Sequence, residues 1–205
     1  MAKYRNRFFK HVQRQCKKYK IKFILLDKHG FDGTEGDTSC GGYFIDNPLE
    51  IGIATETHYK DVLATLVHEF SHFEQFQDKS PFYTKKYRGL DPGTLFCNWL
   101  DGREYKKATI NSCIDIIRDC ELDCDRRALV NIRKFKIPIG IKDYCRKSSA
   151  YLHFHNFVKL SRKWEYKKYP GTFPPIVNKM PTNLDGDYSK TPKEIIKLYR
   201  KYLSS

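Results

Sequence analysis

The sequence lacks any apolar run near the roughly 18 residues that a membrane-spanning helix needs. Its basic N-terminus also lacks the apolar stretch of a secretion signal. The seven cysteines are odd in number and irregularly spaced, which disfavours a disulfide framework. We therefore expect reduced cysteines, no membrane partner and a cytoplasmic location, which is a reducing compartment.

Several common motifs are absent as well. The glycine-rich stretch 27–42 does not end in Gly-Lys-Ser/Thr, so it is not a phosphate-binding loop. We find no internal repeat and no recognised nucleic-acid-binding motif. What is present is a chain of 205 residues, 40% hydrophobic and 15% aromatic. That length suits one sizeable core, and we expect a single domain over residues 1–205.

Negative charge is scarce relative to positive charge. Lys and Arg number 38 against 24 Asp and Glu, which gives a net charge of +14. The basic residues concentrate in stretches 3–22, 159–168 and 193–201. Such a balance favours anionic partners, including nucleic acid, nucleoprotein or acidic protein. Simple solubility is an equally good explanation.

The most informative stretch is His-Glu-x-x-His, formed by His68, Glu69 and His72. On a helix, two histidines four residues apart project from one face, within reach of one metal ion. Glu69 then lies one residue round the helix, placed to take a proton from a water that the metal activates. A coincidental match of two surface or core histidines is the alternative.

The residues around this motif favour a real site. On a helical wheel the large apolar residues gather on one side, and they are Tyr59, Val62, Leu63, Leu66, Val67, Phe70 and Phe73. His72 falls on another side, with the small or polar residues Asp61, Ala64 and Thr65. The histidines therefore occupy a face without bulky side chains, which leaves room for a pocket.

A second predicted helix, around residues 110–132, offers a third ligand. Its apolar stripe consists of Ile110, Ile114, Ile117, Cys124, Ala128 and Ile132, with Glu121 in the middle and Asp125 at the edge. A carboxylate that faces a core needs a cation or a proton. We expect one Zn²⁺ per chain, bound by His68, His72 and Glu121 with water in the fourth position. The alternative is a Glu121 paired with Arg118, Arg126 or Arg127.

His-Glu-x-x-His followed on a later helix by Glu-x-x-x-Asp resembles the zincin metallopeptidases of the gluzincin type. The resemblance implies that Glu121 binds zinc. It also implies that Asp125 contacts and supports the first histidine, His68, without binding the metal itself. The stretches 40–43 and 51–54 are also similar to small SprT-like and ImmA/IrrE-like zincins, in which a hairpin precedes the active helix and its edge strand receives peptide. No CxxC pair of a zinc ribbon is present. The general pattern is that of compact metallopeptidases encoded by bacteria and their phages, which would act in the host cytoplasm.

The expected fold class is α+β. We expect a small zincin-like domain with a short, mostly antiparallel sheet packed on the active-site helix, and with further helices carrying the third ligand. The predicted elements are a basic helix over 2–19, strands over 21–26, 42–45 and 49–55, and an active helix from a Thr55 or Thr57 cap to residue 77. A glycine-rich mobile loop over 27–42 and an irregular connection over 78–103, with a short helix near 95–100, are also expected. A helix over 143–169 completes the first part. An extended surface tail over 172–189 and a final helix capped by Thr191 follow.

The resulting functional prediction is a zinc metallopeptidase with Glu69 as general base and a peptide or protein substrate. Tyr151, His153 and His155 are candidates for stabilising the oxyanion, and the spacing does not choose among them. Two other classes compete with this prediction. One is a non-proteolytic zinc-binding regulator built on the zincin fold, and the other is a basic nucleic-acid-associated protein in which the motif is coincidental.

Overall fold

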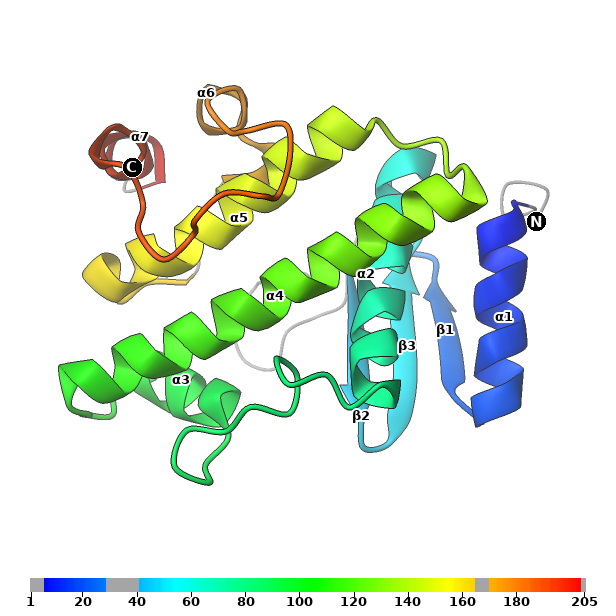
Figure 1. Ribbon diagram of the computed structural model, residues 1–205, viewed down its shortest axis with the longest axis horizontal. Coiled ribbons are helices and arrows are strands. Elements are labelled where there is room, and N and C mark those ends of the chain that lie inside the picture. The colour runs from blue at the N-terminus through cyan, green and yellow to red at the C-terminus, as the bar shows by residue number, and fades with distance from the viewer. Residues whose placement is uncertain (1–5, 29–40, 165–169, 204–205) are drawn as a thin grey trace. The chain divides into compact units, whose positions relative to one another are not determined.

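The computed structural model describes residues 6–28, 41–164 and 170–203 (Figure 1). Within these ranges the chain is α+β, with seven α-helices and a three-stranded mixed sheet. The chain divides into two compact units: unit 1 comprises residues 1–83 and 124–140, and unit 2 comprises residues 84–123 and 141–205. The long helix α4 (Lys107–Phe135) contributes to both units. One domain over the whole chain stays the prediction from the sequence.

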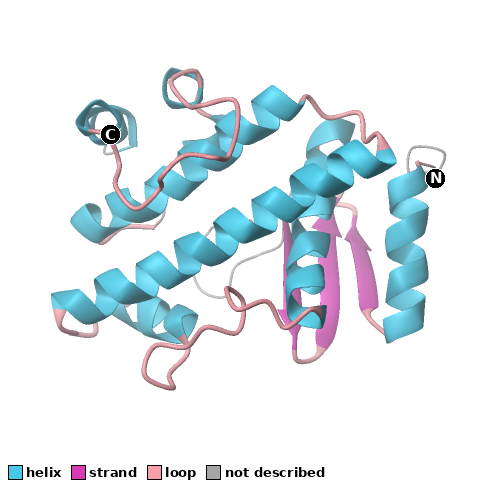
Figure 2. Ribbon diagram, in the orientation of Figure 1, coloured by secondary structure: helices cyan, strands magenta, loops and turns pink. Residues whose placement is uncertain are grey.

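The sheet lies in unit 1 and consists of β1 (Lys22–Leu26), β2 (Gly42–Asp46) and β3 (Leu49–Ala54), in the order β1-β3-β2 (magenta in Figure 2). The β2–β3 pair is the expected antiparallel hairpin, whereas β1 runs parallel to β3. The expectation of a mostly antiparallel sheet is therefore wrong for β1. Side chains alternate with period two in both arrangements, so the sequence pattern does not encode strand direction.

Helix α1 (Arg7–Tyr19) covers part of this unit. The side chain of Asn6 caps it by accepting from the Phe9 amide at 2.7 Å. Phe8, Val12 and Cys16 are buried along one face of this helix. The predicted first residues of this helix, and most of the predicted mobile loop over 27–42, lie outside the described residues.

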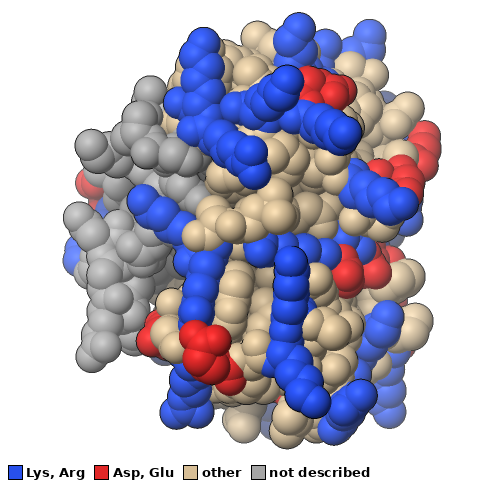
Figure 3. Space-filling model, turned by 90° about the vertical axis from the view of Figure 1, so that its left-hand side faces the viewer, with Lys and Arg blue, Asp and Glu red and all other residues tan. Residues whose placement is uncertain are grey.

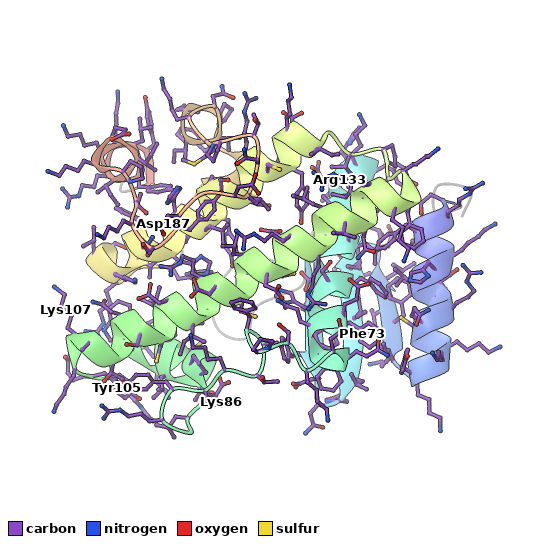
Figure 4. All side chains as sticks on the ribbon, viewed as in Figure 1. Phe73, Lys86, Tyr105, Lys107, Arg133 and Asp187 are labelled. Carbon is purple, nitrogen blue, oxygen red and sulfur yellow. The ribbon has the colours of Figure 1, made fainter. Side chains whose placement is uncertain are left out.

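Helix α2 (Tyr59–Gln77) buries the predicted apolar stripe, which consists of Val62, Leu63, Leu66, Val67, Phe70 and Phe73. Phe73, labelled in Figure 4, contacts the rings of Phe44 on β2 and Tyr19 on α1, with centroid distances of 6.1 and 5.5 Å. The helix is capped by His58, whose Nδ1 accepts from the Lys60 amide. Neither Thr55 nor Thr57 is the cap. The Thr55 hydroxyl instead donates to the Leu26 carbonyl at 3.1 Å and so ties β3 to β1.

Unit 2 is helical. Besides the first part of α4 it contains α3 (Pro92–Leu100), α5 (Ile141–Ser161), a 3-10 helix (Pro170–Thr172), α6 (Pro174–Val177) and α7 (Lys193–Leu203). Its buried core combines residues from all the α-helices of the unit, namely Phe96, Ile110, Ile114, Ala150, Phe154, Phe157, Val158, Ile176, Met180, Ile195 and Tyr199. This mixed origin shows that the unit depends on contacts between segments far apart in sequence.

Two predictions for unit 2 need correction. Helix α5 ends at Ser161 and not at residue 169, because Arg162 has a left-handed φ of 49° and its guanidinium donates to the Trp99 carbonyl. Residues 165–169 of the predicted helix lie outside the described part. The segment 172–189 is not an extended surface tail: it forms α6 and buries Ile176, Met180, Leu184 and Tyr188.

Near the start of α7, the Thr191 hydroxyl donates to the His153 carbonyl on α5 at 3.2 Å. The Asn156 side-chain amide donates to the same hydroxyl oxygen at 3.2 Å. Thr191 therefore links the segment before the last helix to α5. Because α7 begins at Lys193, its cap by Thr191 stays a prediction.

Candidate metal centre

The two motif histidines lie on a half-buried face of α2, whereas the opposite face forms the core of unit 1. Their rings are close and nearly perpendicular, with a centroid distance of 4.8 Å and an interplanar angle of 89°. The histidines and the large apolar residues thus lie on different faces of α2, as the helical wheel predicted. The partners of each ring then decide which nitrogen could bind a metal.

The His68 ring is held by α4. Its Nδ1 lies 3.0 Å from Oδ1 of Asp125, whose residue is only 2% exposed. An ionised carboxylate only accepts hydrogen bonds, so Nδ1 carries the proton and donates it. Nε2 is consequently the nitrogen of His68 with a lone pair for a metal. This carboxylate–histidine arrangement is the one that commonly orients a zinc ligand.

The His72 ring is held from within α2 itself. Its Nδ1 donates to the side-chain carbonyl oxygen of Gln75 at 2.8 Å, and Gln75 is fully buried. The same reasoning makes Nε2 the metal-binding nitrogen of His72. The sequence pattern did not indicate Gln75 as a site residue. The available signal was its spacing of three residues, which places two side chains of a helix next to each other.

Cys124 also reaches this face, which the sequence analysis placed only in an apolar stripe. Candidate ligand atoms of His68, His72 and Cys124 all lie within 4.8 Å of one another. The Cys124 thiol, however, donates to the His68 carbonyl at 3.2 Å. Its sulfur lies 3.7 Å from Nδ1 of His68, which is the nitrogen engaged by Asp125. Cys124 thus lies beside the histidine pair, close to the ring nitrogen that Asp125 engages.

The donor set fits a zinc ion. Imidazole nitrogens, with a carboxylate or thiolate as a further ligand, are typical of zinc sites. Both rings already have the outer hydrogen bonds that such ligands need. Glu69, the predicted base, follows His68 directly on α2 and is 9% exposed. Glu69 is thus largely shielded from bulk water.

Close packing fixes one edge of the sheet beside the histidine face. A Cβ atom at Gly42 would lie 2.5 Å from Cγ2 of Thr65 and 2.9 Å from the Gly52 carbonyl oxygen. Only glycine allows β2 to approach α2 and β3 this closely. Thr65 is one turn before His68 on α2, so the edge strand β2 begins one helical turn from the motif.

The remaining predicted site residues belong to unit 2. Glu121 lies on α4, and its charge acts on His155 of α5 by raising the pKa of that histidine. His155 is 1% exposed, and burial is the larger influence, so the pKa is lowered overall. Glu121 as the third zinc ligand stays a prediction.

The other two oxyanion candidates also lie on α5. The His153 ring nitrogen Nδ1 lies 3.1 Å from the Thr191 hydroxyl, and burial lowers the pKa of His153 to about 4. Tyr151 is half-buried, with its ring 4.7 Å from that of His155. Their oxyanion roles stay predictions.

Two of the three arginines named as alternative partners of Glu121 have other ion pairs. Arg118 pairs with Asp115 and Asp119, and Arg127 pairs with Asp78. Arg118 is nevertheless 4% exposed, which shows that α4 keeps buried charge balanced in its first part.

None of the six cysteines in the described ranges forms a disulfide, as expected for reduced thiols. In the same ranges no helix is both long and apolar enough to cross a membrane. Comparison of the chain with protein-family models, with curated proteins and with solved structures gives no match.

Proposed function

We propose that the protein is a zinc-dependent metallopeptidase with a zincin-like arrangement of unit 1. The observation that supports this most is the pair of hydrogen bonds from Nδ1 of His68 to Asp125 and from Nδ1 of His72 to Gln75. They direct Nε2 of both motif histidines to a shared ion. A surface pair of histidines with no function has no need of two buried acceptors.

When bound, zinc supplies a Lewis acid that polarises a substrate carbonyl and lowers the pKa of water. Glu69 accepts the proton of the attacking water and delivers it to the leaving amine. Asp125 and Gln75 keep the two imidazoles in one tautomer and one orientation throughout. An intact glutamate at this position favours catalysis over a purely regulatory zinc protein.

The proposed substrate is an extended segment of peptide or protein. Strand β2 is at the edge of the sheet and begins beside Thr65 of α2. An extended chain can add to such an edge through main-chain hydrogen bonds, which read the backbone more than the side chains. This placement would bring a peptide bond to the face of α2 that carries the histidines.

For the third ligand we retain Glu121, predicted from the sequence, over Cys124. The Cys124 thiol is already a donor to the His68 carbonyl, and its sulfur lies 3.7 Å from Nδ1 of that ring. Replacing zinc by Co²⁺ distinguishes the two, because a cysteine ligand adds a thiolate-to-cobalt charge-transfer band in the near ultraviolet. We expect no such band, retained metal in Cys124→Ala and lost metal in Glu121→Ala. A thiolate band that disappears in Cys124→Ala would show that Cys124, and not Glu121, is the third ligand.

The test of catalysis is Glu69→Gln, which keeps the shape of the side chain and removes its basicity. Zinc content and the unfolding temperature should stay as in the wild type, while cleavage of an unfolded protein substrate should be lost. Equal cleavage by the variant would remove Glu69 from the general-base role. No cleavage by either protein at full zinc occupancy would favour the non-proteolytic alternative.

Basic side chains suggest the nature of the partners. Figure 3 shows a face on which Lys and Arg side chains greatly outnumber Asp and Glu. It is the side on which α7 lies in Figure 1, and the exposed cations of that helix are Lys193, Lys197, Arg200 and Lys201. We propose that this charge attracts acidic or nucleic-acid-bound substrates.

A further inference from the structure

Strand β2 is at the edge of the sheet, and its ladder shows which main-chain groups face outward. The Ala54 amide donates to the Gly41 carbonyl at 2.9 Å, so these two residues form a hydrogen-bonded pair. Because such pairs alternate along an antiparallel ladder, Tyr43 is bonded to β3 whereas Gly42 and Phe44 are not. The amides and carbonyls of Gly42 and Phe44 therefore point away from β3, to the side on which none of the described strands lies.

These two residues lie beside the part of α2 that carries the histidine pair. A Cβ atom at Gly42 would lie 2.5 Å from Cγ2 of Thr65, and the ring centroids of Phe44 and Phe76 are 5.9 Å apart. Along α2, Thr65 is one turn before the first motif histidine, and Phe76 is one turn after the second. A peptide strand that pairs with the outer edge from Gly42 to Phe44 therefore passes alongside both histidines.

Phe76 belongs to a cluster of three aromatic rings beside this edge. The ring centroids are 5.9 Å apart for Phe44 and Phe76, 6.1 Å for Phe76 and Tyr83, and 6.3 Å for Phe44 and Tyr83. All three residues are half-buried, unlike Phe73 of the core, which is 2% exposed. The Tyr83 hydroxyl donates to Oδ2 of Asp46 at 3.2 Å, which holds the third ring against the end of β2. This aromatic cluster therefore keeps apolar surface in contact with solvent at the edge of the sheet.

The pairing rules of a sheet direct a substrate side chain to the aromatic cluster. Directly opposed residues of neighbouring strands have their side chains on the same face of the sheet. The Phe44 side chain is on the α2 face, since its ring contacts that of Phe73. We propose that the aromatic cluster is a substrate subsite, which binds the large apolar side chain of the peptide residue paired with Phe44. The inference rests on the proposed function and adds to it a preference for cleavage next to a large apolar residue.

The other face of β2 is already filled at the same level. A Cβ atom at Gly52 would lie 2.4 Å from Cε1 of Tyr43, so the Tyr43 ring lies across Gly52. The Tyr43 hydroxyl donates to Glu50, which fixes the ring on the sheet. Ile45, on this same face, is 41% exposed and is separate from the aromatic cluster. We therefore expect the side-chain preference at the peptide residue paired with Phe44 and not at the residues next to it.

The test uses the zinc-loaded full-length protein and two short peptides of small residues that differ at one position, which is Phe or Ala. We expect kcat/KM to be about tenfold or more higher for the Phe peptide, with cleavage next to the Phe. Phe76→Ala should abolish the difference between the peptides, whereas Ile45→Ala, on the other face of β2, should keep it. Cleavage of both peptides by the wild type with equal kcat/KM would overturn the subsite and leave the metallopeptidase proposal standing.

Peptide binding tests the subsite without catalysis, in the zinc-loaded Glu69→Gln protein. Nuclear magnetic resonance should show the amide signals of Gly42 and Phe44 shifting on addition of the Phe peptide. Its affinity should be about tenfold higher than that of the Ala peptide. This preference without any cleavage by the wild type would keep the subsite and remove the metallopeptidase proposal. Equal affinities for the two peptides, or unchanged signals of Gly42 and Phe44, would contradict the subsite.

Discussion

Nδ1 of His68 donates a hydrogen bond to Oδ1 of Asp125 at 3.0 Å, which links the motif helix α2 to α4 through a carboxylate that is 2% exposed. The bond fixes the histidine tautomer and increases the basicity of Nε2. The resemblance to gluzincins implied a supporting role for Asp125, and the contact supports that role for a protein that binds zinc through His68.

Removing this carboxylate should weaken zinc binding without abolishing it. We expect Asp125→Ala to reduce zinc affinity by about 10–100-fold, because the ring loses its orientation but keeps its lone pair. Chelator competition measures the change. Asp123→Ala is the control on the same helix, two residues away and therefore on another face. Equal zinc affinity in Asp125→Ala and the wild type would show that the hydrogen bond is structural only.

Gln75 should behave in the same way for His72. Gln75→Leu removes the buried acceptor at similar volume, and we expect about a tenfold loss of zinc affinity. Gln75→Glu should retain most of the affinity, because a carboxylate oxygen can still accept from Nδ1. If both variants lost zinc equally, the effect would come from disturbed packing and not from the hydrogen bond.

Buried histidines of unit 2 should make the protein less stable in acid. Burial, helped by Arg118, lowers the pKa of His153 from its usual 6.5 to about 4, while Asp187 (labelled in Figure 4) opposes the shift. Between these two values the unfolded chain binds more protons than the folded one. The free energy of unfolding should therefore fall as pH drops from about 6.5 to about 4, by roughly 3 kcal/mol from this group.

Urea unfolding of the wild type and of His153→Gln at pH 7 and at pH 4.5 measures this contribution. The variant should show a smaller loss of stability between the two pH values. Identical pH dependence in His153→Gln and the wild type would contradict the predicted titration.

The basic surface should bind nucleic acid in a salt-dependent way. Reversing Lys193, Lys197, Arg200 and Lys201 on α7 to glutamate should weaken binding to non-specific DNA or RNA and leave zinc content unchanged. In the wild type, affinity should fall steeply between about 50 and 200 mM salt, since phosphate contacts release counterions. Absence of binding at about 50 mM salt would mean that the charge serves solubility.

Local patterns carried the successful sequence predictions. The stripe from Val62 to Phe73 has the period of a helix, and such a pattern needs no knowledge of the partner it packs against. The hairpin β2–β3 and the α2 helix were predictable for the same reason. The resemblance to gluzincins pointed to Asp125, which contacts His68, and its role in zinc binding stays a prediction.

What the sequence did not predict depends on contacts between distant segments. The contact of Gln75 with His72 depends on the orientation of the His72 ring. The position of Cys124 beside His68 depends on the packing of α4 against α2 within unit 1. The end of α5 depends on a left-handed φ at Arg162, a residue with no special preference for it. The buried positions Ile176 and Tyr188 stand in a stretch whose prolines and glycines suggested a surface tail.

The central claim is that His68 and His72 hold one zinc ion, and zinc stoichiometry tests it most directly. Metal analysis compares the purified wild type with His72→Ala and with His58→Asn, a control that keeps a capping side chain at the start of α2. We predict about one zinc per chain in the wild type and in His58→Asn, as expected for a single His-Glu-x-x-His site, and a large loss in His72→Ala. A wild-type protein without zinc, or full zinc occupancy in His72→Ala, would contradict the account.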